Sequence, residues 1–157
     1  MPQVRKGHHG FTLIELVASI TIMAILAAIA LPRLTDTAPF AERGYADGVA
    51  ASLRQSRAVA MASGCDVQFT ITAAGYSAFQ HGAGANNHCA PAGGWTTPVK
   101  RGNGRNIAEW PPTGVALAAN KTLVFAAVDG TVAAGPLSIN IGPQTITVDA
   151  SGVVQGP

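Results

Sequence analysis

The chain has 157 residues, of which 48% are hydrophobic and 11% are charged, and its formal net charge is +2. This length accommodates one modest domain plus an anchor, and the hydrophobic fraction excludes a disordered chain. The sequence shows no paired carboxylates and no nucleophile–base pair, so we expect neither an enzyme nor a cofactor.

The N-terminus carries a short basic leader with Arg5 and Lys6, followed by an almost uncharged apolar run that ends at Leu31. The run is about 20 residues long, which matches one bilayer crossing. Glu15 is its one ionisable residue, and an acid at membrane depth is costly enough to indicate a function. Alternatively, Glu15 only extends to the membrane interface near the helix start.

Two other interpretations of this segment are a secretory signal and a plain anchor. A signal peptide would be cut after Ala30, at the exit site Ala28-Ile29-Ala30. The apolar run is long for a signal core, however, and Glu15 interrupts it. A plain single-pass anchor requires neither Gly10 nor Glu15, so it leaves both residues unexplained.

The chain after the apolar run predicts a second helical segment that ends near Gly64, a credible helix stop. Pro32 and Pro39 should kink or break the helix. Small and apolar residues then recur at helical spacing and predict one buried stripe: Ala46, Val49, Ala50, Leu53, Ser56 and Ala60. Charged residues mark the opposite, wetter side: Arg43, Asp47, Arg54 and Arg57.

Beyond Gly64 the apolar residues alternate with polar ones, which is typical of half-buried strands. We expect strands at residues 67–72, 76–80, 115–117, 122–125, 137–141, 146–148 and 153–154. The stretch 81–112 is rich in Gly, Asn and Pro and predicts a long, functional loop. The fold class is therefore α+β, with a long N-terminal helix packed on a small antiparallel β-sheet domain.

Two cysteines, Cys65 and Cys89, lie in the segment that the anchor would export. An even cysteine count outside the cytoplasm favours one disulfide. This bond would close a loop of roughly 25 residues and stabilise the domain by about 3 kcal/mol. His81 and His88 flank Cys89, but their spacing fits no compact zinc pattern, so we expect no metal site.

A basic cluster, Lys100, Arg101 and Arg105, lies between Trp95 and Trp110. Basic residues interleaved with aromatic ones can hold single-stranded nucleic acid. The more common arrangement is a solvated loop whose tryptophans pack on the sheet. We expect the solvated loop and keep DNA binding as the second interpretation.

The N-terminus resembles those of type IV pilins and type II secretion pseudopilins in residues 10–16, Gly-Phe-Thr-Leu-Ile-Glu-Leu, and in Pro32. The resemblance implies that a prepilin peptidase removes residues 1–10 and that Phe11 becomes an N-methylated first residue. It also implies that Glu15 meets the Phe11 amine of a neighbouring subunit during assembly. Loss of the leader would lower the Lys and Arg count from ten to eight, which equals the Asp and Glu count.

Four later segments, residues 53–60, 67–69, 125–130 and 146–152, resemble the GspH/FimT family of minor pseudopilins and minor pilins. The implied divisions are a leader at 1–10, a transmembrane and assembly helix at 11–31, an amphipathic continuation at 32–63 and a periplasmic β-domain at 64–157. DNA-binding members carry a Gly-Arg-x-Arg tail, whereas residues 152–155 here are Gly-Val-Val-Gln. The missing arginines count against a DNA-uptake minor pilin and against nucleic acid as a partner.

The resemblance also implies a location and partners. The chain would cross the bacterial inner membrane once and then enter a type IV pilus or a secretion pseudopilus, in the complex at the initiating tip. Its partners would be other pilin or pseudopilin subunits, the prepilin peptidase and the inner membrane.

Overall fold

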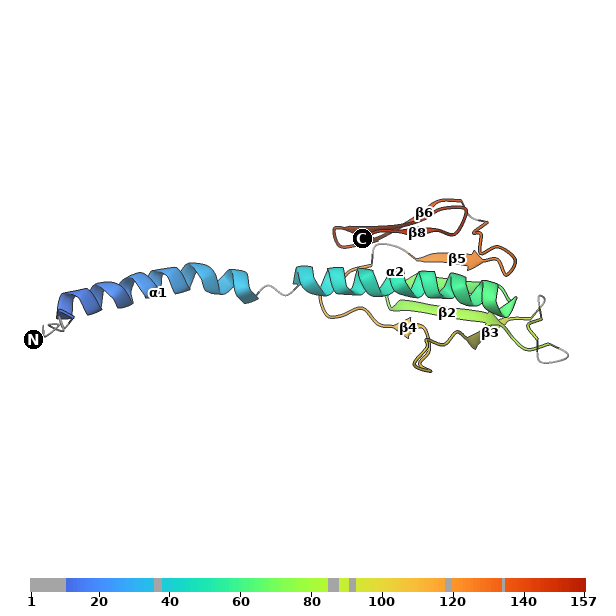
Figure 1. Cartoon of the computed structure of the whole chain (residues 1–157), viewed down its shortest axis with the longest axis horizontal. Coiled ribbons are helices and arrows are strands. Elements are labelled where there is room, and N and C mark those ends of the chain that lie inside the picture. Colours follow the sequence, from blue (N-terminus) through green and yellow to red (C-terminus); the bar gives the residue numbers. More distant parts are fainter. Residues whose placement is uncertain (1–10, 36–37, 85–87, 91–92, 118–119, 134) are drawn as a thin grey trace, which may run out of the picture. The chain divides into compact units, whose positions relative to one another are not determined.

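The computed structural model describes residues 11–157 except 36–37, 85–87, 91–92, 118–119 and 134, and it leaves out the side chains of 31–38. The expected leader, with Gly10, therefore lies outside the described residues. The chain forms two units that divide between Thr37 and Ala38. The first contains a single helix, and the second contains a helix with all of the strands (Figure 1).

Helix α1 spans Leu13–Thr35 and begins at a side-chain cap. The backbone N–H of Glu15 donates to the Thr12 hydroxyl at 3.3 Å and to the Thr12 carbonyl at 3.1 Å. A threonine followed three residues later by a glutamate is the sequence of a capping box. The helix continues through Pro32, so of the kink or break expected there the break does not occur; proline removes one backbone donor but its φ angle suits a helix.

Helix α2 spans Ala38–Ser63 and has Pro39 in its first turn, where a missing N–H costs little. The predicted stripe is buried along one face: Ala46, Val49, Ala50, Leu53, Ser56 and Ala60. The helix ends where predicted, because Gly64 has a φ of 65° and its N–H donates to the Ala60 carbonyl at 3.0 Å.

The strands form two antiparallel sheets rather than the single sheet expected. The first has the order β3-β2-β1-β5, with β4 also paired to β2; the strands are β1 (Val67–Thr72), β2 (Gly75–His81), β3 (Trp95–Pro98), β4 (Ala108–Glu109) and β5 (Lys121–Phe125). The second has the order β6-β7-β8, from β6 (Leu137–Ile141), β7 (Gln144–Val148) and β8 (Val154–Gln155). Helix α2 contacts strands of both sheets and lies along them (Figure 1).

The core lies between α2 and these sheets. Strand β1 buries Val67, Phe69 and Ile71 and turns the intervening polar residues outward, as the period of two predicted. Strands β6 and β7 alternate in the same way. The sheets thus cover the apolar face of α2 from both sides of its buried stripe.

One loop prediction and one strand prediction were wrong. The stretch 81–112 contains β3, β4 and a tight hairpin closed by the Lys100–Asn106 bridge. Among the described residues of this segment that follow Cys89, Val99 and Ile107 are the buried apolar ones, and two such isolated residues leave no detectable period. Residues 115–117 form no strand, because Leu117 makes a single bridge to Ile141.

Candidate functional site

The α1 surface over residues 13–30 is apolar except for Glu15 and the small polar residues Ser19 and Thr21. The segment Leu13–Ala30 is long and apolar enough to cross a membrane, and none of it is buried within the structure. Its large side chains are all exposed, from Val17 at 42% to Leu13 at 81%. A continuous apolar surface of this size requires lipid or protein to cover it.

Glu15 lies in the first turn of this apolar helix. Its carboxylate is exposed, and the one ion pair within the described part of the chain involves other residues. The partly positive N-terminus of the helix favours a carboxylate at this position. The Thr12 cap fixes the backbone there, so the acid is held at the helix start and is available to a group outside α1.

Two turns of the second unit pack against each other and against Arg57. The Nε of Arg57 donates to the Gly130 carbonyl at 3.2 Å, and an Nη donates to the Ser151 carbonyl at 3.1 Å. A Cβ added at Gly152 would overlap the Gly130 carbonyl oxygen, and one added at Gly130 would lie 2.8 Å from the Arg57 Nε. Segments 125–130 and 146–152 therefore contact each other, and Arg57 of α2 bonds to a carbonyl at this contact from each side.

Arg54 is exposed and Arg57 is half-buried, so they lie on the wetter side of α2 as predicted, but both also bind carbonyl groups of distant turns. Arg54 donates to the carbonyls of Val154 at 3.4 Å and Gly156 at 3.2 Å. Helical spacing predicts only that these side chains avoid the buried stripe. It gives no information on the carbonyl groups that the distant C-terminal turns bring to them.

A polar cluster joins α2 to strands β2 and β4 in the same domain. The Tyr76 hydroxyl donates to a Glu109 carboxylate oxygen at 2.9 Å and accepts from Arg101 at 2.7 Å. Arg101 pairs with Glu109 at 3.0 Å, and the Ser52 hydroxyl donates to Tyr76 at 3.1 Å. The cluster satisfies the polar groups that Ser52 and Tyr76 bury beside the core.

The charges of this cluster support one another. The hydrogen bond from Arg101 holds the pKa of Glu109 below its usual value, and the same bond raises the pKa of Arg101. Burial raises the pKa values of Tyr45 and Tyr76, so both phenols remain neutral donors. The arrangement ties a hairpin to the helix, and Tyr76 and Glu109 also line an open cavity beside Trp110.

The basic cluster is therefore divided, which corrects the expectation of three solvated charges. Lys100 and Arg105 are exposed, whereas Arg101 is engaged with Glu109 and Tyr76. Sequence spacing alone could not reveal this pairing, because Glu109 reaches Arg101 only when the intervening hairpin folds.

Replacing Arg101 with Ala should lower the free energy of unfolding by about 1–2 kcal/mol, since hydrogen bonds to charged groups are lost at a partly exposed site. Lys100→Ala and Arg105→Ala are matched controls and should each change it by less than about 0.5 kcal/mol. Urea unfolding followed by tryptophan fluorescence measures all three. Equal effects of the three substitutions would contradict a stabilising role for Arg101 in the polar cluster.

The two tryptophans differ in environment, so only one prediction about them is confirmed. Trp95 stacks on His81 of β2, with ring centroids 3.8 Å apart. Trp110 is 78% exposed and borders an open cavity of about 230 Å³, so it does not pack on the sheet.

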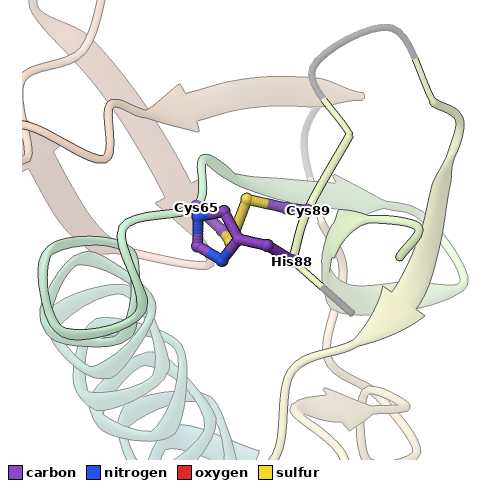
Figure 2. Close-up of side chains that lie close together, drawn as sticks. All are labelled: Cys65, His88 and Cys89. Carbon is purple, nitrogen blue, oxygen red and sulfur yellow. A yellow bond between two sulfur atoms is a disulfide. The ribbon is translucent and has the colours of Figure 1, made fainter. Parts of the chain in front are cut away.

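The predicted disulfide is present between Cys65 and Cys89, whose Cα atoms are 5.8 Å apart. It ties the loop between β2 and β3 to Cys65, which lies just after the end of α2. His88 lies beside the bond (Figure 2), whereas the His81 Nδ1 bonds to the Gly93 carbonyl at 2.5 Å. In the oxidised protein neither sulfur is a free thiolate, so the bond and a metal site exclude each other.

Loss of Cys65 should destabilise the domain by about 3 kcal/mol, because the unfolded chain regains the entropy of the opened loop. The double variant Cys65→Ser/Cys89→Ser should match the single variant, since either change breaks the same bond. Thermal unfolding measures stability, and limited proteolysis should show new cuts within residues 82–94. Free thiols on both residues of protein purified without reductant would contradict the bond.

Comparisons with known proteins agree with both units. Residues 5–31 match the prokaryotic N-terminal methylation motif. A segment of 51 residues is 47% identical to the type IV narrow pilus major component PilA5 of Thermus thermophilus, and it covers 32% of this chain and 44% of that protein. The chain therefore spans less than half the length of this relative.

The structure also resembles a solved structure. The likeness is to the type IV minor pilin FimU of Pseudomonas aeruginosa, with a TM-score of 0.55 over 77% of this chain and 91% of that chain. The sequences are 14% identical, so this likeness establishes the fold alone.

Proposed function

We propose that this chain, which is pilin-like in its N-terminal motif and in its fold, is a minor pilin or pseudopilin that assembles through α1. Its place would be the initiating complex of a type IV pilus or of a type II secretion pseudopilus. The observation that carries the proposal is the fully exposed apolar helix that begins at a methylation motif and contains a single acid, Glu15.

Before assembly, α1 would lie in the inner membrane, with the β-domain in the periplasm. An exported domain explains why the two cysteines form a disulfide, because disulfides persist in oxidising compartments. Removal of residues 1–10 would leave Phe11 as a charged amine one residue before the Thr12 cap. The helix would keep its cap after the cut, since the Thr12 hydroxyl and the Glu15 N–H that donates to it both follow Phe11.

Assembly would move α1 from lipid into a bundle of similar helices. Glu15 is costly in an apolar medium unless it meets a cation. The Phe11 amine of a neighbouring subunit supplies that cation, and the pairing would fix the axial offset between subunits. Apolar side chains along the rest of α1 would then pack on neighbouring helices in place of lipid.

DNA binding is not part of this proposal. Arg101 is engaged within the domain, which leaves two exposed cations, Lys100 and Arg105, in the candidate cluster. Residues 153–155 supply no arginine. Binding to DNA depends on several phosphate contacts, and two isolated cations offer few.

Intact-mass and N-terminal analysis of the membrane-extracted chain tests the proposed processing. The result we expect is Phe11 as the first residue, with a methylated amine. A chain that begins at Leu31 would instead establish an ordinary signal peptide and would remove the assembly helix from the mature protein.

A further inference from the structure

The disulfide is one part of a three-residue cluster at the end of α2. Cys65 follows the helix, whereas His88 and Cys89 come from the loop between β2 and β3. One possible ligand atom from each of the three side chains lies within 4.8 Å of the others. Figure 2 shows the His88 imidazole and both sulfur atoms on the same side of the loop.

The backbone holds His88 at this position. The Gly84 N–H donates to the His88 carbonyl at 2.5 Å, and Ala83 pairs with Cys89. The imidazole lies over Gly64, where an added Cβ would be 3.9 Å from the His88 Cε1. These contacts hold the backbone of His88 and place its imidazole beside Gly64.

We propose that Cys65, His88 and Cys89 bind a divalent zinc-like cation when the disulfide is reduced. A dithiol reductant would supply two electrons and two protons, becoming a disulfide itself, and the chain would gain two thiols. Binding the cation releases those two protons and leaves two thiolates and one neutral imidazole as ligands. This donor set is a known zinc set of the open kind, with three protein ligands.

The geometry requires only local movement. Zinc–sulfur bonds of about 2.3 Å would place the two sulfur atoms roughly 3.8 Å apart, so they must separate after reduction. An open cavity of about 240 Å³ borders the three residues and leaves room for a water as the fourth ligand. Cys89 is only half-buried, so reductant and cation can reach the site.

As a consequence, the loop between β2 and β3 would stay attached to the end of α2 in both redox states. The disulfide ties it to α2 in the oxidised protein, and the bound cation ties it in the reduced protein. His81 borders the same cavity but bonds to Gly93 and stacks on Trp95, so it is outside the ligand set.

Cobalt(II) titration of the full-length chain in detergent micelles tests the site, with and without a phosphine reductant. The reduced chain should bind one Co²⁺ with a thiolate-to-metal absorption band, and the oxidised chain should show none. His88→Ala should weaken binding by more than about tenfold, since even outer-shell changes at metal sites cost 10–100-fold. His81→Ala is the matched control and should leave the affinity unchanged.

Two outcomes would overturn the proposal. One is a reduced chain that shows no thiolate band with one equivalent of Co²⁺. The other is unchanged affinity in His88→Ala, which would assign the band to the thiols alone. If reduction unfolds the chain, circular dichroism of the same samples still tests the site. Adding Co²⁺ should then refold the reduced chain, whereas it should not refold reduced His88→Ala.

Discussion

Glu15→Val should leave the chain in the membrane but lower its recovery from sheared filaments by at least about tenfold. The substitution removes the one charge of the apolar segment, so membrane insertion should not suffer. It also removes one partner of the proposed pair with the neighbouring amine. Breaking a buried ion pair costs about 3–5 kcal/mol. About 1.4 kcal/mol already corresponds to a tenfold change, so the expected loss is at least that large. Quantitative immunoblots of membrane and filament fractions measure both effects.

Two matched variants separate charge from shape in this experiment. Glu15→Gln keeps the side-chain size and should fail as Val does. Thr21→Val also replaces a polar residue of α1 with an apolar one, and its hydroxyl bonds only to carbonyls of its own helix. It should assemble normally. Normal filament recovery of Glu15→Val would contradict the assembly role.

Gly152→Ala should destabilise the second unit by about 3–5 kcal/mol, among the largest effects of a single methyl group. Gly152 has a φ of 78°, a conformation that costs an alanine about 1 kcal/mol, and is buried. The added Cβ would also overlap the Gly130 carbonyl, which Arg57 binds. To relieve this overlap, the turns at Gly130 and Gly152 would have to move apart.

Gly104→Ala is the matched control for this effect. Gly104 has a φ of 80°, but its Cβ would meet nothing within 4 Å. It should therefore cost only about 1 kcal/mol, the backbone term alone. Thermal unfolding of both variants in the same detergent gives the comparison. Equal losses would show that the contact between the two turns contributes nothing.

Local patterns predicted the fold where one residue type or one period determines the structure. Gly64 ends α2 because its left-handed conformation suits glycine, and the alternation in 67–72 determines which side chains of β1 are buried. The apolar run and the cysteine count likewise needed no knowledge of tertiary contacts. The predicted antiparallel arrangement is confirmed, although it comprises two sheets.

The missed features depend on contacts between distant residues. Arg57 finds its acceptors at Gly130 and Ser151, more than seventy residues later. Arg101 finds Glu109 only across a folded hairpin, and His88 reaches the disulfide only because residues 83 and 89 pair. A period or a composition cannot show such contacts, and β3 and β4 are too short to have a period of their own.

The most direct test of the proposed function is the peptide composition of sheared filaments. Filaments from cells with and without a prepilin peptidase are digested and analysed by mass spectrometry for peptides of this chain. We expect a peptide that begins at methylated Phe11 in the filament fraction of peptidase-containing cells and none in the peptidase-deficient fraction. A chain found only in membranes, or in the medium with Leu31 as its first residue, would contradict a filament subunit.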